Sequence, residues 1–143
     1  MIAVDTNVLV YAHREGFPLH RKARDAVVAL AGDGAAWGIP VFCLGELIRI
    51  ITHPRLFDPP HTSEDACDAM TRLLASPGLR LLGPGPRYWA LFDKAIRESG
   101  ATGNLVFDAQ IVAVCRENGV SALLTEDRDY ARFPGFPVEH LHR

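Results

Sequence analysis

The amino-acid sequence predicts an α/β fold, a single domain with a central parallel sheet of about five short strands and helices on both faces. Short apolar or β-branched runs alternate with segments of helical periodicity, the pattern of strands joined by crossover helices. The length of 143 residues suits one domain, and neither a linker nor an internal repeat divides residues 1–143. Acidic residues also follow two of the predicted strands, where parallel sheets place their ligand sites.

In the first half of the chain, strands and helices are separated by short turns. An apolar run before Asp5 predicts a strand, and Thr6 is available to cap the next helix. Apolar residues at three- and four-residue steps predict a second helix, which Gly32 ends, and Pro40 can open a third. The elements expected here are a strand over 2–4, helices over 7–12 and 18–31, a strand over 35–39 and a helix between Pro40 and Pro54.

In the second half, helices again alternate with strands. Ser63 begins a helix after a Pro-rich loop, and Pro77-Gly78 ends it. Asn104 can cap the helix that carries Asp108. The elements expected here are helices over 63–75, 86–99 and 105–117 and strands over 79–82, 121–124 and 137–141, with 125–129 as a polar loop.

Five acidic residues each have an ordinary structural explanation when taken alone. Asp5 could simply cap the helix after it. Glu46 lies in an apolar helix, where it must be paired, protonated or metal-bound, and an ion pair with a nearby arginine is the main alternative. Asp108 lies near a helix N-terminus, where the helix dipole favours an anion. Asp127 and Asp129 lie in a turn, where Asp forms local hydrogen bonds, and their spacing is expected to direct only one of them inward.

Taken together, the five acids predict a metal site. Carboxylates that meet at one edge of a sheet repel one another strongly, and proteins tolerate this when divalent cations neutralise them. Oxygen ligands without suitably spaced Cys or His favour Mg²⁺ or Mn²⁺ over zinc. Such ions activate water and stabilise the attacking and leaving oxygens of a phosphodiester, so no covalent protein nucleophile is needed. The sequence contains no nucleophile elbow, P-loop or dinucleotide fingerprint that would indicate other chemistry.

Four blocks of sequence, in order and over residues 2–134, resemble the PIN domain and in particular the VapC toxins of VapBC toxin–antitoxin systems. A lone Asp-Thr-Asn would be weak, but four ordered blocks are a specific signal. The blocks are Asp5-Thr-Asn-Val-Leu-Val-Tyr-Ala12, Gly45-Glu46-Leu47, Gly103-Asn-Leu-Val-Phe-Asp108-Ala109 and Leu124-Thr-Glu-Asp127-Arg-Asp129-Tyr-Ala-Arg-Phe133.

The resemblance implies a Mg²⁺- or Mn²⁺-dependent endoribonuclease. Its metal-binding and catalytic acids would be Asp5, Glu46, Asp108 and Asp127, while Asp129 would bind metal through water or support the loop. It implies as well a homodimer and a cognate small VapB-type antitoxin. Three polar residues match positions that orient the acids, although helix capping explains the first two equally well; they are Thr6, Asn7 and Thr125.

Two other functions remain open from the sequence. A catalytically silent module could use the same fold to bind RNA or a protein, although retention of all the acids argues against it. A metal-dependent phosphatase of small molecules would need a closed pocket or a D-x-D-x-T motif, which Asp5-Thr-Asn-Val does not provide.

The net charge of −2 is unusual for a protein that binds nucleic acid. If five of the 17 acids bind cations, however, 15 basic residues face 12 acidic ones. Basic residues gather in two clusters, within residues 13–24 and 49–55, and each cluster is either a substrate contact or a solvated helix face. The residues singled out as possible phosphate contacts are His13, Arg49, His53 and Arg55.

The N-terminus has no basic and apolar leader, so a cytosolic protein is expected. The two most apolar stretches, residues 39–51 and 105–115, are shorter than the roughly 20 residues that span a bilayer, so no membrane span is expected. The three cysteines, Cys43, Cys67 and Cys115, are interpreted as reduced core residues. Trp37 and Trp89 are expected in the core or a dimer interface, although an exposed one could stack on a base.

Overall fold

The computed structural model describes residues 1–141 and contains a five-stranded parallel sheet, which confirms the predicted α/β class. The strands are β1 (Ile2–Val4), β2 (Trp37–Pro40), β3 (Leu79–Leu82), β4 (Ala122–Leu124) and β5 (Val138–Glu139). They lie in the order β3-β2-β1-β4-β5, and every neighbouring pair is parallel. Because β1 is central, the residue that follows it stands in the middle of the carboxyl edge of the sheet.

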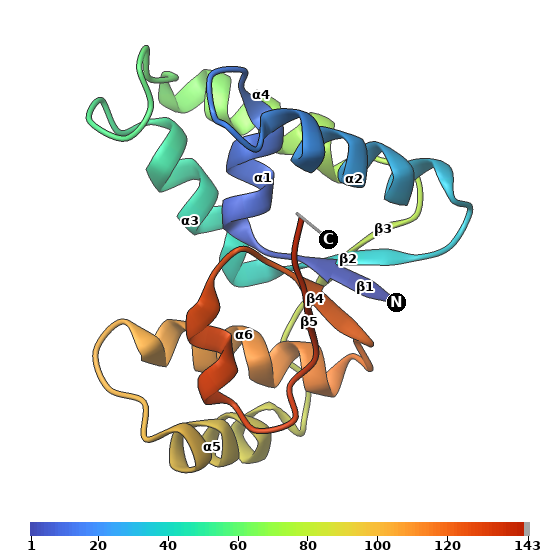
Figure 1. Cartoon of the computed structure of the whole chain (residues 1–143), viewed down its shortest axis with the longest axis vertical. Helices are drawn as coiled ribbons and strands as arrows, with labels where there is room; N and C mark the ends of the chain where they lie inside the picture. Colours follow the sequence, from blue (N-terminus) through green and yellow to red (C-terminus); the bar gives the residue numbers. More distant parts are fainter. Residues whose placement is uncertain (142–143) are drawn as a thin grey trace.

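Helices cover both faces of the sheet. They are α1 (Thr6–His13), α2 (His20–Gly32), α3 (Val41–Ile51), α4 (Ser63–Leu74), α5 (Tyr88–Ser99) and α6 (Leu105–Glu117), with a 3₁₀ helix η1 (Arg128–Arg132). In Figure 1, α1, α2 and α4 lie above the sheet, and α5 and α6 lie below it. The observed bounds differ from the predicted ones by a few residues, mainly at helix starts. Among the described residues, no helix has the length and hydrophobicity needed to cross a membrane.

Strand β2 is buried in the hydrophobic core and packs closely against its neighbours. Every residue of β2 is buried, and the indole N–H of Trp37 donates to the carbonyl of Pro77 at 2.9 Å. Gly38 is needed at this point, because a Cβ there would lie 2.6 Å from Cδ1 of the buried Leu82. The close approach of β2 and β3 thus depends on a residue without a side chain.

The structure corrects the expectation for Cys67, and it excludes the core, one of the positions expected for Trp89. Cys43 and Cys115 are buried and reduced as predicted, but Cys67 is exposed, because α4 turns Ala66 and Ala69 inward instead. Trp37 lies in the core as predicted, whereas Trp89 is 69% exposed on α5, so it is not a core residue.

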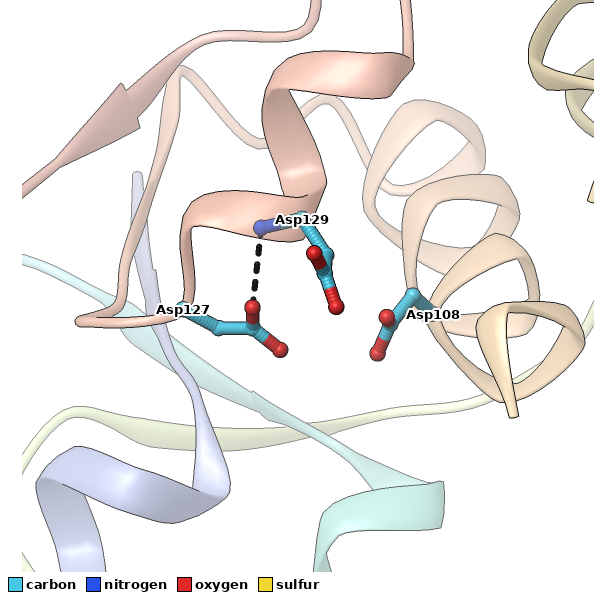
Figure 2. A group of neighbouring side chains, drawn as sticks. All are labelled: Asp108, Asp127 and Asp129. Carbon is cyan, nitrogen blue, oxygen red and sulfur yellow. Dashed lines mark hydrogen bonds between the residues drawn. The ribbon is translucent and has the colours of Figure 1, made fainter.

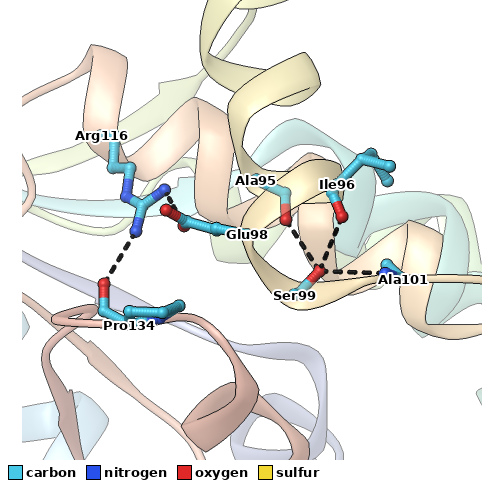
Figure 3. A network of polar contacts seen from close by, with 7 residues as sticks. All are labelled: Ala95, Ile96, Glu98, Ser99, Ala101, Arg116 and Pro134. Carbon is cyan, nitrogen blue, oxygen red and sulfur yellow. Dashed lines mark hydrogen bonds and ion pairs between the residues drawn. The ribbon is translucent and has the colours of Figure 1, made fainter.

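The junction of α5 and α6 is fixed by polar contacts (Figure 3). Arg116 of α6 forms an ion pair with Glu98 of α5 and donates to the carbonyl of Pro134 at 3.3 Å. The Ser99 hydroxyl donates to the carbonyl of Ala95 and accepts from the backbone N–H of Ala101. These contacts set the course of the turn that leads into α6, and α6 carries Asp108.

Candidate active site

Asp5 forms the closed end of the site. It is 4% exposed, and its backbone N–H donates to the carbonyl of Leu124, which ties it to β4. It is the N-cap of α1, since its Oδ1 accepts from the backbone N–H of Thr6 at 2.8 Å. The prediction that Thr6 caps this helix is therefore wrong: α1 begins at Thr6 itself, so the preceding residue is the cap. Thr6 supports Asp5 through its backbone amide.

The Thr125 hydroxyl connects the first and last sequence blocks. It donates to Asp5 Oδ2 at 2.7 Å and accepts from Asn7 Nδ2 at 3.2 Å and from the Asp127 backbone N–H at 3.0 Å. One donor and two lone pairs are all that a hydroxyl offers, so its capacity is used completely. Asn7 also donates to Asp5 Oδ2 and accepts from the backbone N–H of Glu126. Strand β1 and the loop after β4 are thereby held in fixed register.

Asp127 and Asp129 both reach the site, which corrects the expectation that only one of them points inward. Asp127 is the N-cap of η1, and its side chain accepts from the backbone N–H of Asp129 at 2.9 Å. Because the chain enters a 3₁₀ turn here, it brings both carboxylates toward Asp108 (Figure 2). Among the described residues, no backbone N–H donates to the other carboxylate oxygen of Asp127, which faces the site.

Asp108 supplies the third carboxylate from the first turn of α6. One side-chain oxygen each of Asp108, Asp127 and Asp129 lies within 4.8 Å of the other two. Burial, followed by the charges of Asp127 and Asp5, raises the pKa of Asp108 to about 7. The predicted cap of this helix is wrong in detail: Asn104 occupies the N-cap position, but its backbone is already helical and its side chain makes no cap hydrogen bond.

Glu46 approaches the same site from α3. Burial and the charge of Asp5 raise its pKa, and Arg49 one turn later lowers it. The ion-pair alternative is not realised as a close contact, because the ion pairs found among residues 1–141 do not include Glu46. The charge of Glu46 thus interacts with the other acids, and the positive charge of Arg49 offsets part of this repulsion.

A single cavity of about 750 Å³ connects these groups. Four acids line it: Glu46, Asp108, Asp127 and Asp129. Arg49 lines it as well, whereas the other three proposed phosphate contacts, His13, His53 and Arg55, are not among its lining residues. His13 instead faces His61, with their Nε2 atoms 2.9 Å apart, and the His53 ring accepts from the backbone N–H of Arg55.

Sequence reasoning missed several residues that line this cavity. Phe42 and Phe107 provide aromatic walls, Gln110 an amide, and Gly45 an open space. Gly45 and Phe107 do stand directly before Glu46 and Asp108 in the matched blocks. A better signal is helical spacing, because residues three or four apart lie on one helix face, and Phe42 stands four residues before Glu46 in α3.

The site can hold a divalent cation, judged by the chemistry of its donors. Three carboxylates converge, two more lie close enough to raise the pKa of Asp108, and hard oxygen ligands of this kind suit Mg²⁺ and Mn²⁺. Burial is the largest cause of the raised pKa of Asp108 and the charges of the four neighbouring acids come next, and a cation bound here would offset both by favouring the ionised carboxylate. The residues present therefore fit the metal.

The fold and site define an α/β protein with a carboxylate centre at the carboxyl edge of a parallel sheet. A model of the PIN domain matches residues 2–135, so the chain belongs to the PIN-domain family, as the sequence blocks indicated. It is 39% identical over 133 residues to the VapC ribonuclease Mb2897 of Mycobacterium bovis, covering 93% of this chain and 90% of that protein. It is 33% identical over 135 residues to ribonuclease VapC48 of Mycobacterium tuberculosis, covering 94% and 92%.

Solved structures show the same fold. The VapBC2 complex of Rickettsia felis, bound to a DNA fragment from its promoter, contains a chain with a TM-score of 0.71 and 18% identity, and the match covers 98% of both chains. VapC20 of Mycobacterium tuberculosis, a toxin that cleaves the sarcin–ricin loop, has a TM-score of 0.67 and 19% identity, and the match covers 95% of this chain and 96% of that one. At this identity the likeness concerns the fold.

Proposed function

We propose that this protein is a metal-dependent endoribonuclease and the toxin of a type II toxin–antitoxin pair. The observation that carries the proposal is the convergence of Asp108, Asp127 and Asp129 in one open cavity. Burial, followed by the charges of the neighbouring acids, raises the pKa of Asp108 to about 7. Protein-bound cations on such a centre hydrolyse phosphodiesters with water. The curated relatives, which span nearly the whole chain, are ribonucleases, and this supports RNA as the substrate.

The cation is proposed to be Mg²⁺ or Mn²⁺. Asp108, Asp127 and Asp129 would hold it directly, since one side-chain oxygen of each lies within 4.8 Å of the other two. When bound, the cation supplies an activated water and stabilises negative charge on the oxygens of the phosphodiester. Cys and His ligands are absent from the cluster of described residues, which favours these hard ions over zinc.

The chain's own residues would orient and tune this centre. Asp5 is held by the Thr125 hydroxyl, the Asn7 amide and the Thr6 backbone N–H, so its position does not depend on the cation. Glu46, with a raised pKa and partial exposure, is suited to accept a proton from the attacking water. Arg49 at the cavity wall is suited to bind a phosphate oxygen of the substrate.

Cleavage of structured RNA in the presence of Mn²⁺ tests the active site. We expect Asp108→Asn to lower kcat by about two to three orders of magnitude, because the neutral amide would hold the cation less well, and the cation would stabilise the negative charge of the transition state. Asp68→Asn, an exposed acid on α4, is the matched control and should cleave like the wild type. Equal cleavage by Asp108→Asn and the wild type would remove Asp108 from the mechanism.

Calorimetric titration with Mn²⁺ separates this proposal from the silent binding module. An enzyme of this type should bind the ion, and Asp108→Asn should bind it more weakly. A silent module should bind Mn²⁺ weakly or not at all, and both variants would then look alike. Wild-type protein that binds no Mn²⁺ and cleaves no RNA would decide for the binding module.

The partner is proposed to be a small VapB-type antitoxin, and the functional form a homodimer in the cytosol. Solved neighbours of the same fold are VapBC complexes, which supports the partner. Induced expression should arrest growth, and co-expression of the small protein encoded beside this chain should restore it. Light scattering measures the oligomeric state directly. Growth that is unaffected by the active protein would contradict the toxin assignment.

A further inference from the structure

Phe107 is the most exposed aromatic ring that borders the acidic cavity. It is 61% exposed in the first turn of α6, yet it lines the cavity together with its neighbour Asp108. A single exposed apolar side chain needs no explanation, but one placed at the mouth of a charged cavity is a candidate ligand contact.

A second aromatic ring supports this wall. Phe42, from the first turn of α3, is half-buried and lines the same cavity. Its ring centroid lies 6.1 Å from that of Tyr88, which in turn lies 5.5 Å from that of Phe92. Gly45, on the next turn of α3, leaves open space where a side chain would stand. The cavity therefore combines acids with an aromatic wall and has room beside them.

We propose that Phe107 stacks on an unpaired base of the nucleotide that adjoins the phosphate to be cleaved. The inference rests on the proposed ribonuclease function and names its substrate class as single-stranded or looped RNA. A base is joined to its phosphate through one sugar, so a base lies beside any phosphate that a cation at Asp108 and the Arg49 side chain would hold in the cavity. Bases inside an A-form duplex are stacked on each other, whereas unpaired bases can stack on an aromatic ring.

A second copy of this chain is the competing occupant of Phe107. Continuity with the cavity favours RNA, because Phe107 shares its opening with Asp108 and Arg49, and a protein surface pressed on it would cover the acids. Trp89, which is more exposed than Phe107, is not among the residues that line the cavity. It is therefore the appropriate aromatic residue for comparison.

Cleavage kinetics with Mn²⁺ test the proposal on an RNA whose cut site is mapped with the wild type. We expect Phe107→Ala to raise KM and lower kcat/KM by about tenfold, as loss of one stacked base does, with Mn²⁺ affinity unchanged. Phe107→Tyr should restore the wild-type values, and Trp89→Ala should match the wild type.

The same RNA with an abasic nucleotide beside the cut phosphate identifies the interaction. The wild type should lose on this RNA about what Phe107→Ala loses on normal RNA, and the two changes together should cost no more than one of them. If the losses in kcat/KM from Phe107→Ala and from the abasic nucleotide multiply when both changes are present, the proposal is overturned. Unchanged cleavage of normal RNA by Phe107→Ala would also overturn it. A Phe107→Ala protein that turns from dimer to monomer in light scattering would assign the ring to a subunit contact.

Failure of the ribonuclease proposal gives a different result. If the wild type binds Mn²⁺ but cuts no RNA, the proposed function and the stacking contact both fall. If the wild type cuts RNA and Phe107→Ala cuts it equally well, only the stacking contact falls.

Discussion

The closed and open ends of the site are built in opposite ways. At the closed end, Asp5 is 4% exposed and accepts hydrogen bonds from Thr6, Asn7 and Thr125. At the open end, no hydrogen bond to the Asp108 carboxylate is found among residues 1–141, and burial with neighbouring charges raises its pKa to about 7. The protein itself thus fixes the position of one acid, and it leaves the other with repulsion that a cation can relieve.

Thr125→Val tests the closed end and should have the largest effect on activity of the three predictions that follow. The change removes the donor to Asp5 Oδ2 and the acceptor of the Asp127 backbone N–H, while the side chain keeps its shape. Loss of such a supporting contact typically lowers metal affinity or activity by about 10- to 100-fold. The measurement is kcat/KM for RNA cleavage together with Mn²⁺ affinity.

Thr125→Ser is the matched control, because it retains the hydroxyl and should keep most of the activity. If both variants are equally impaired, the methyl packing of this fully buried residue matters more than its hydrogen bonds. The closed end would then be stabilised by packing, and the contrast between the two ends would disappear.

The pH dependence of stability tests the open end. A carboxyl whose folded pKa is about 7, against an ordinary value of 3.8, binds more protons in the folded state. The cation-free protein should therefore lose stability as the pH rises from about 4 through 7. Between about pH 5.5 and 8 the free energy of unfolding should fall by about 1 to 2 kcal/mol, since solvent screens part of this half-buried charge.

Urea unfolding at the two pH values, with and without Mn²⁺, provides the measurement. Saturating Mn²⁺ should raise stability most at the higher pH, where the acids are ionised. Asp108→Asn should flatten most of the dependence and lose most of the Mn²⁺ effect. His13, whose pKa burial lowers, contributes with the opposite sign, so the deciding quantity is the difference between the wild type and Asp108→Asn. An equal pH dependence in both would show that Asp108 does not have the raised pKa described.

The periodicity of the sequence was sufficient to predict the fold, and the positions of the acids together with the four sequence blocks indicated the candidate site, but neither could predict how each acid is held. Asp5 was interpreted as either a helix cap or a metal ligand, and it is the cap while also lying in the acid cluster. A capping role does not remove Asp5 from the cluster, because its charge raises the pKa of Asp108 even though both of its carboxylate oxygens accept hydrogen bonds from the protein.

Local conformation decided the remaining differences. A turn at residues 127–129 is expected to direct only one of the two aspartates inward. The 3₁₀ helix η1 instead brings the carboxylates of both Asp127 and Asp129 close to Asp108. Phe107 was passed over because an apolar residue in an apolar helix predicts burial, and only its position on α6 shows that it is exposed. The direction of these side chains and the exposure of Phe107 depend on which face of each helix borders the cavity. The sequence pattern of a single helix or loop does not determine this.

Gly45→Ala should have the smallest effect and sharpens the contrast from the open side. Gly45 lies within α3, and a Cβ there would meet nothing within 4 Å. Alanine should therefore stabilise the helix by about 0.5 to 1 kcal/mol, measured by urea unfolding, with little change in kcat/KM. Gly38→Ala is the matched control, because its Cβ would lie 2.6 Å from the Leu82 side chain in the core and should destabilise the protein. If Gly45→Ala also destabilises the protein, the space beside Glu46 is filled in solution, and the site is less open than the structure indicates.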